Sequence, residues 1–128
     1  MNNFTGLKLY DKALELADRI YGITATFPRT EIFGLSSQMQ RASVSVGSNI
    51  AEGAARNSKR EFYHFLGISK GSASELQFQI ELSFRKKYIS ETDKLQVLDN
   101  IDAIMRMNFN LQQSLQKNRD RSNRNKPD

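Results

Sequence analysis

Glu61 and His64 have the residue types and the spacing that could hold a metal ion. A Glu-x-x-His motif supplies two ligands from one helix in di-iron four-helix bundles, but such a site needs a second motif of this kind and further glutamates. His64 is the one histidine in 128 residues. Its position about 200° around a helix from Phe62 predicts that it points away from the apolar face. We expect no metal site and no bound cofactor.

Other arrangements that support catalysis are also missing from the sequence. The segment GISKGS, residues 67–72, contains lysine, glycine and serine, but in an order that differs from a P-loop and in the interior of a predicted helix. The chain has no cysteine, which excludes a thiol nucleophile and a thiolate metal site. No carboxylate is spaced to complete a serine and histidine arrangement with His64. We therefore predict a non-enzymatic protein with no catalytic residues.

The elements that would position any functional residue are amphipathic helices. Apolar residues recur at spacings of three and four, as on one face of a helix. We predict four helices, at about residues 7–27, 36–55, 58–87 and 91–117. Because the connections are short, neighbouring helices should be antiparallel. The predicted fold is all-α, an antiparallel up-down four-helix bundle in a single domain, residues 1–117, followed by a flexible basic C-terminal tail, residues 118–128.

Each predicted helix has a seam of residues that should form the core. The seam positions, in chain order, are Leu9, Ala13, Leu16, Ile20, Ile23, Phe27, Met39, Ala42, Val46, Asn49, Phe62, Leu66, Ser69, Ala73, Leu76, Ile80, Val97, Ile101, Ile104, Asn108, Leu111 and Leu115. Phe65, Ile68 and Leu82 are expected to widen the apolar face of the third helix. Pro28 should end the first helix. The second, third and fourth helices each have a pair of residues with capping-box spacing at the N-terminus. The pairs are Ser37 with Gln40, Ser58 with Glu61 and Ser90 with Asp93.

Small residues are concentrated between Gly34 and Leu76. A glycine inside a helix costs about 1 kcal/mol relative to alanine, so it is expected where another backbone must approach closely. Helix packing within one bundle does not need all of these small residues, which suggests a second contact, between subunits. Arg56, four residues after Glu52, is expected to form an ion pair with it, and Arg41 is an alternative partner. The candidate structural or oligomer-interface residues are Arg41, Gly47, Asn49, Glu52, Gly53, Arg56, Gly67, Gly71 and Glu75.

The chain is moderately basic, with a net charge of +5 and a pI of about 9.6. Basic residues exceed acidic ones by six to three between Ser58 and Tyr88, and by four to two in residues 118–128. Such patches attract nucleic-acid phosphates. The candidate nucleic-acid-binding residues are Lys59, Arg60, Arg85, Lys86, Lys87, Arg119, Arg121, Arg124 and Lys126.

Structural explanations compete with nucleic-acid binding at two of these clusters. Residues 85–87 fall in the last turn predicted for the third helix, where cations favour the negative end of the helix dipole. The C-terminal tail could serve only as a solvated end. Lys59 and Arg60 lie in a first turn, where the dipole disfavours cations, so helix stability does not explain them. We also expect a cytoplasmic protein without membrane contact, since the sequence has neither a signal-peptide pattern nor about 18 consecutive apolar residues.

Four short sequence segments resemble those of a known family. They are FPRTEIFGLSSQ from Phe27, SNIAEG from Ser48, REFYHFL from Arg60 and KGSASEL from Lys70. Across about residues 7–90 the chain resembles the four-helix bundle proteins encoded by intervening sequences in 23S rRNA genes. It departs from that family at Gln40, which precedes Arg41 where paired arginines are usual, and at Gly47, where proline is common.

The resemblance implies an antiparallel bundle assembled as a ring-like homo-pentamer. Related accessory proteins of diversity-generating retroelements bind nucleic acid beside a reverse transcriptase, so the resemblance also implies RNA or DNA, and a protein such as a reverse transcriptase, as partners. Two hypotheses follow. The first is an oligomeric bundle that binds RNA or DNA through basic surfaces in an rRNA or ribonucleoprotein context. The second is an oligomeric protein-interaction scaffold that binds no nucleic acid.

Overall fold

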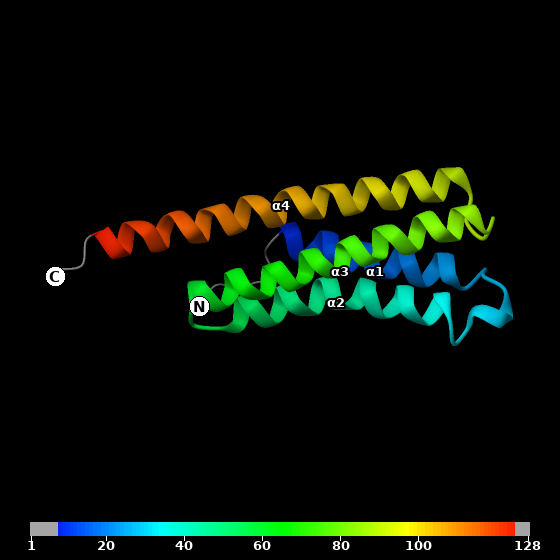
Figure 1. The fold of residues 1–128 in the computed structure, drawn as a ribbon, viewed down its shortest axis with the longest axis horizontal. Helices are drawn as coiled ribbons and strands as arrows, with labels where there is room; N and C mark the ends of the chain where they lie inside the picture. The colour runs from blue at the N-terminus through cyan, green and yellow to red at the C-terminus, as the bar shows by residue number, and fades with distance from the viewer. Residues whose placement is uncertain (1–7, 125–128) are drawn as a thin grey trace.

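A computed structural model describes residues 8–124, with side chains as far as Lys117. It contains four α-helices and one short 3₁₀ helix, and no strand in the described residues (Figure 1). Their bounds are α1 Lys8–Thr24, η2 Arg29–Glu31, α2 Leu35–Ala55, α3 Lys59–Arg85 and α4 Glu91–Arg124. The all-α prediction is confirmed, and the four helices are consistent with a four-helix bundle.

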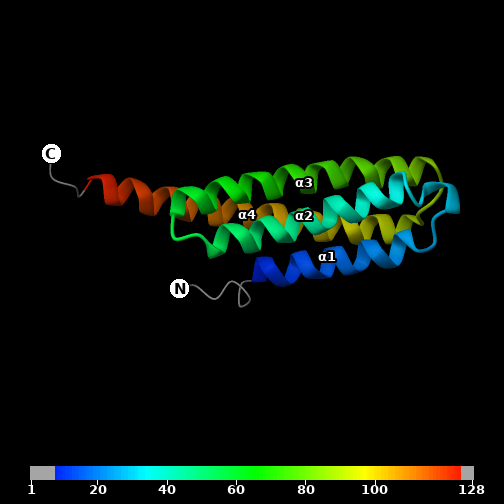
Figure 2. The ribbon, with the colours of Figure 1, turned by 90° about the horizontal axis from the view of Figure 1, so that it is seen from below.

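Consecutive helices lie side by side with alternating direction, and α1 also contacts α4 (Figures 1 and 2). The diagonal pairs, α1 with α3 and α2 with α4, lie farther apart. With 17 residues, α1 is about half the length of the 34-residue α4. As a result, α1 covers only part of the bundle, and the C-terminal end of α4 projects beyond the other helices (Figure 2).

The predicted seams form the core. Every seam residue is buried except Asn49, Phe62, Leu111 and Leu115, which are half-buried. Two expectations are wrong: Ile68 and Leu82, predicted to widen the apolar face of α3, are 40% and 36% exposed. They lie on the side of α3 that turns away from both α2 and α4. Ile50, which the predicted seam omits, is fully buried.

Buried polar side chains tie α3 to both of its neighbours. Ser69 Oγ donates to the carbonyl oxygen of Val46 on α2 at 2.8 Å. On the other side, Asn108 Nδ2 on α4 donates to the carbonyl oxygen of Leu66 at 3.0 Å. Such bonds satisfy polar groups that would otherwise be costly to bury. They also fix the registers of α2 and α4 along α3.

Among the glycines inside the described helices, Gly53 has the closest neighbours on another helix. A Cβ added there would lie 2.7 Å from Phe65 Cβ and 3.0 Å from the ring of Phe62, both on α3. The predicted close approach is therefore confirmed at Gly53. The prediction of a close approach is wrong at Gly71, because a Cβ added there would meet no other atom of the chain within 4 Å.

The end of α1 and the start of α2 differ from the prediction. α1 ends at Thr24 because the next residues, before Pro28, form tighter turns, in which the amide nitrogens of Thr26 and Phe27 donate to carbonyls three residues back. α2 begins at Leu35, and Glu31 Oε1 accepts from the Leu35 amide nitrogen at 3.1 Å. This bond replaces the predicted cap by Ser37 and Gln40.

The predicted caps of the other two helices are confirmed. Ser58 Oγ accepts from the Glu61 amide nitrogen at 3.1 Å, and Ser90 Oγ accepts from that of Asp93 at 3.1 Å. Each hydroxyl satisfies an amide donor that has no partner inside its helix.

The end of α3 also corrects the prediction. The helix stops at Arg85, so Lys86 and Lys87 lie beyond it rather than in its last turn. Lys87 has a φ of 64°, and the amide nitrogens of Lys87 and Tyr88 donate to the carbonyls of Phe84 and Ser83. This is a Schellman motif, in which a left-handed residue satisfies the last helical carbonyls.

The predicted tail is helical in its first part. α4 continues to Arg124, so residues 118–124 belong to a helix rather than to a flexible segment. No glycine or proline occurs in these residues, and a helix that has already formed adds further residues at little cost. Residues 125–128 lie outside the described residues.

The loops at one end of the bundle are tied together by Tyr88. Its hydroxyl donates to Glu31 Oε2 at 3.0 Å, while the other oxygen of Glu31 caps α2. The ring of Tyr88 also packs against Phe27, with centroids 5.3 Å apart. The hydrogen bond to Glu31, followed by burial and by the negative charge of Glu31, raises the pKa of Tyr88 above its ordinary value.

Gly53 and Gly71 provide a matched pair of substitutions. We expect Gly53→Ala to lower the free energy of unfolding by about 1–3 kcal/mol, because its methyl group overpacks the α2/α3 contact. Gly71→Ala should raise it by up to about 1 kcal/mol, because alanine favours the helix and has open space. Urea unfolding of both variants measures the difference. A loss of stability for Gly71→Ala would instead reveal a second surface, such as another subunit, lying against it.

Tyr88→Phe should remove a stabilising interaction that depends on pH. A raised pKa means that the folded protein favours the protonated phenol, so its contribution is complete below about pH 10 and is lost as the pH rises further. Thermal unfolding at pH 8 should show a lower midpoint for Tyr88→Phe than for the parent protein. The gap should narrow above pH 10. A gap that stays constant up to pH 12 would contradict this account.

Candidate functional site

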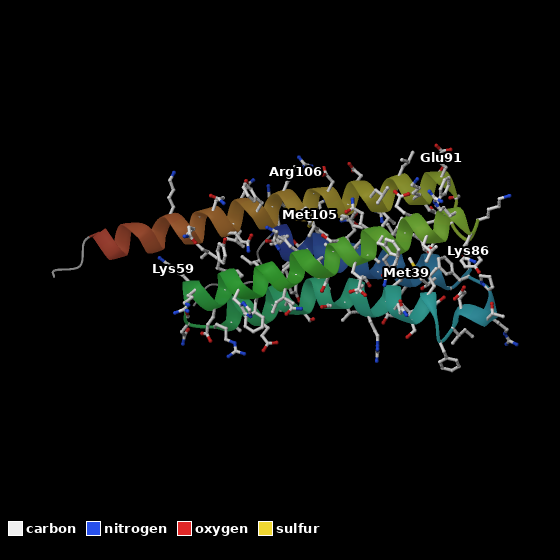
Figure 3. All side chains as sticks on the ribbon, in the orientation of Figure 1. Met39, Lys59, Lys86, Glu91, Met105 and Arg106 are labelled. Carbon is white, nitrogen blue, oxygen red and sulfur yellow. The ribbon has the colours of Figure 1, made fainter. Side chains whose placement is uncertain are left out.

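The predicted basic residues of α3 lie at opposite ends of the bundle. Lys59 begins this 27-residue helix, and Lys86 follows its end, so the two are about 40 Å apart along the axis. Figure 3 shows them at opposite ends of α3. They form two separate surfaces in one chain.

At the start of α3, Lys59 and Arg60 are exposed and form no ion pair with any described side chain. They directly follow the N-cap Ser58, where the helix dipole is positive and disfavours a cation. By contrast, nearby Arg56 is neutralised: its guanidinium lies 2.9 Å from Glu52, 4.0 Å from Glu61 and over the ring of Phe65. Lys59 and Arg60 are thus free to bind an external anion.

The C-terminal part of α4 reaches this same end. Gln112 Nε2 donates to the carbonyl oxygen of Tyr63 at 3.1 Å, so in the antiparallel pair residue 116 is level with Lys59. Residues 117–124 therefore extend about 12 Å beyond the start of α3, as the projecting end of α4 in Figure 1 shows.

The projecting part of α4 carries more of the predicted basic residues. The backbone of Arg119, Arg121 and Arg124 belongs to the helix, and Lys117, which the prediction did not include, is exposed. Lys126 lies outside the described residues. We call the start of α3 together with this segment the basic end; its basic residues are Lys59, Arg60, Lys117, Arg119, Arg121 and Arg124.

The other predicted cluster is placed differently. Arg85, Lys86 and Lys87 are exposed at the end of α3 and in the loop that follows. Cations there are favoured by the dipole of α3. The acidic first turn of α4, with Glu91 and Asp93, comes shortly after, and Glu91 lies at the same end of the bundle as Lys86 (Figure 3). A structural role accounts for this cluster without a ligand.

Several residues near the basic end were not identified as site residues from the sequence. Tyr63 and Phe109 are 39% and 51% exposed, and Lys70 Nζ lies 5.8 Å from the centroid of the Phe109 ring. The spacing of four and three between Tyr63, Gly67 and Lys70 is the sequence signal that places these α3 residues on one face. The contribution of α4 depends on helix register, which the sequence alone does not reveal.

The proposed interface residues divide into inward and outward groups. A Cβ added at Gly47 would lie 3.4 Å from Ala13 Cβ on α1, and one added at Gly67 would lie 3.7 Å from Gln112 Nε2 on α4. Asn49 Nδ2 donates to the carbonyl oxygen of Ser45 at 2.8 Å. The residues that the chain leaves exposed are Arg41, Glu52, Arg56, Gly67, Gly71 and Glu75.

The two exposed arginines among the proposed interface residues, Arg56 and Arg41, have different surroundings. Arg56 forms the predicted ion pair with Glu52. Arg41 does not pair with it and instead lines a surface hollow of about 360 Å³ between α1 and α2. An adjoining hollow of about 230 Å³ shares Val44 and Ser48 with the first and is lined largely by apolar residues.

The Glu61 and His64 pair is not joined by further ligands. Among the described residues, no group of three or more histidine, cysteine, aspartate or glutamate side chains could hold a metal ion. His64 is exposed, as predicted, with its ring edge-on to Phe65 at 5.7 Å. Between residues 8 and 124, no helix is long and apolar enough to cross a membrane.

Comparisons with known proteins agree with the fold. A model of the family described as 23S rRNA-intervening sequence protein matches residues 5–110. No curated protein matches the chain. A crystal structure from Bacteroides thetaiotaomicron, described as a protein of unknown function from the S23 ribosomal protein family, is 27% identical, with a TM-score of 0.75. The match covers 80% of this chain and 96% of that one. The chain therefore belongs to the 23S rRNA-intervening sequence protein family.

Proposed function

We propose that this protein is a non-enzymatic bundle that binds RNA or DNA through its basic end, in an rRNA or ribonucleoprotein context. The observation that carries the proposal is the exposed pair Lys59 and Arg60, which has no ion-pair partner among the described side chains. The pair stands where a helix dipole opposes positive charge, so its placement works against stability. A bound phosphate would compensate for that cost.

The charge balance of the basic end supports this proposal. The two segments that form it contain six basic residues and two acidic ones, Glu61 and Asp120. Phosphate contacts by lysine and arginine release counterions from nucleic acid, which makes binding favourable and sensitive to salt. The projecting end of α4 would extend this contact beyond the bundle.

The proposal includes assembly into a ring, with five subunits implied by the family resemblance. The hollows between α1 and α2 leave Leu14, Tyr21 and Val44 between 45% and 55% exposed, which suits a contact with another subunit. A head-to-tail contact closes into a ring when its rotation permits. Each added subunit would bring another basic end and raise the avidity for a long nucleic acid.

One observation favours the second candidate, a protein-interaction scaffold. Phe33, in the loop before α2, is 97% exposed, and the preceding Ile32 is 52% exposed. An aromatic side chain presented this openly is typical of an anchor that fills a pocket in a partner. This loop lies at the end opposite the basic end (Figure 1), so a protein partner and a nucleic acid would not compete for the same surface.

The helix dipole predicts that the basic pair lowers stability. We expect Lys59→Glu combined with Arg60→Glu to raise the free energy of unfolding by about 0.3–1 kcal/mol at low salt, because acidic residues favour the first turn of a helix. Urea unfolding at low and high salt measures this, and the stabilisation should shrink as salt screens the dipole. A clear loss of stability would show that the pair has a structural role in the folded chain.

The same double variant tests the proposed function. Fluorescence anisotropy with a structured rRNA fragment at about 50–200 mM salt should show binding by the parent protein and at least tenfold weaker binding by Lys59→Glu with Arg60→Glu. The salt slope should fall by about 2, because two fewer phosphates are neutralised in the complex. A scrambled RNA and a duplex DNA measure specificity.

A matched control is available at the opposite end. Arg85→Glu with Lys86→Glu changes the net charge by the same amount, and it should leave affinity within about threefold of the parent. Equal losses of affinity for the two double variants would assign binding to overall charge rather than to the basic end. Absence of binding by the parent protein, together with a protein partner that co-purifies despite nuclease and high salt, would favour the scaffold.

A further inference from the structure

We propose that the side of the α3/α4 pair next to the basic end binds unpaired nucleotides by stacking their bases on Tyr63 and Phe109. We call this surface the α3/α4 strip; it consists of Tyr63, Gly67 and Lys70 on α3 and Phe109 on α4. The inference rests on the proposed function and narrows its ligand to a single-stranded segment of RNA or DNA.

The strip is held together by one buried side chain. Gln112, which is 5% exposed, donates from Nε2 to the carbonyl oxygen of Tyr63 at 3.1 Å and accepts from Lys70 Nζ through Oε1 at 2.9 Å. The same Lys70 ammonium lies 5.8 Å from the Phe109 ring centroid, within the range of a cation–π contact. Gln112 therefore positions both the backbone at Tyr63 and the cation beside Phe109 before any ligand binds.

The two rings are open to solvent, and Gly67 leaves the surface of α3 beside them without a side chain. Phe109 is 51% exposed and Tyr63 is 39% exposed, although the core of the bundle runs directly beneath. Gly67 lies between Tyr63 and Lys70 on the same face, and a Cβ added there would meet only Gln112 Nε2, at 3.7 Å. With no side chain at this position, a planar base can approach the helix surface between the aromatic ring and the cation.

Positive charge borders the strip where a phosphate backbone would pass. Lys59 and Arg60 precede Tyr63 by four and three residues and so share its side of α3. Across the strip on α4, Asp102 is already paired with Arg106 at 3.2 Å. Proteins that bind single strands combine a basic track with aromatic rings on which bases stack. In a duplex the base faces are stacked inside the double helix. A duplex can therefore bind the basic end through its phosphates but cannot stack its bases on Tyr63 and Phe109.

Other exposed aromatic residues lack this combination. Phe78 on α3 is 69% exposed, and Phe33 in the loop before α2 is 97% exposed. Among the described side chains, cations lie over the rings of Phe65, Phe84 and Phe109 but not over these two. Of the aromatic residues with a cation partner, Phe109 is the one whose ring is largely exposed. Phe78 therefore serves as the control position, because it lies on the same helix as Tyr63 and is even more accessible.

The test compares a single strand with a duplex of the same sequence. Tyr63→Leu and Phe109→Leu each remove a ring but keep an apolar side chain, and Phe78→Leu is the matched control. Anisotropy with a 12-nucleotide unstructured RNA at about 100 mM salt should show at least fivefold weaker binding for each strip variant. Binding to the blunt duplex should change by less than twofold, and Phe78→Leu should bind both RNAs like the parent. Thermal unfolding by circular dichroism checks that each variant is folded.

A second measurement needs no substitution. Photo-crosslinking of the parent protein to the same RNA containing 4-thiouridine should give adducts on the peptides that hold Tyr63 or Phe109. Adducts found only elsewhere would overturn the strip as the base-binding surface.

The possible failures can be told apart. If strip variants bind the single strand like the parent while Lys59→Glu with Arg60→Glu still weakens binding, stacking is overturned and the proposed function stands. If the parent protein binds neither RNA even at about 50 mM salt, the proposed function fails and the inference fails with it.

Discussion

The close approach of α2 and α3 at Gly53 is the contact on which the rest of the structure depends. Because Gly53 has no side chain, Phe62 and Phe65 pack directly against the backbone of α2. Further along the same pair, Ser69 bonds to the backbone of α2 at Val46. This pairing holds the start of α3 firmly in place, so the basic residues there are displayed on a rigid helix rather than on a loop.

The two ends of the bundle have different physical properties. At one end, Glu31 caps α2 and accepts from the Tyr88 hydroxyl, which ties the two loops there to each other. At the other end, α2 and α3 meet in a short turn and, of the described helices, only α4 continues outward. Positive charge without ion-pair partners lies beside this extension. The molecule therefore combines one end whose loops are tied to each other by Glu31 and Tyr88 with a basic end available to a ligand.

The sequence predicted the features that depend on local spacing and missed those that depend on register. Helical periodicity identified most of the core, and the Ser58 and Ser90 caps followed from the residue three positions later. The cap at Leu35 was missed because Glu31 acts from outside α2. The exposure of Ile68 depends on where α2 and α4 pack around α3, and the α3/α4 strip depends on how Gln112 aligns with Tyr63. Periodicity within one helix does not contain this information.

Hydrogen–deuterium exchange of the parent protein with and without a saturating single-stranded RNA would test the central claim most directly, because it locates the bound surface without any substitution. The account predicts slower exchange in the first turns of α3 and along the C-terminal half of α4, with little change in the loops around Glu31 and Tyr88. Protection confined to those loops, or to the hollows between α1 and α2, would contradict it.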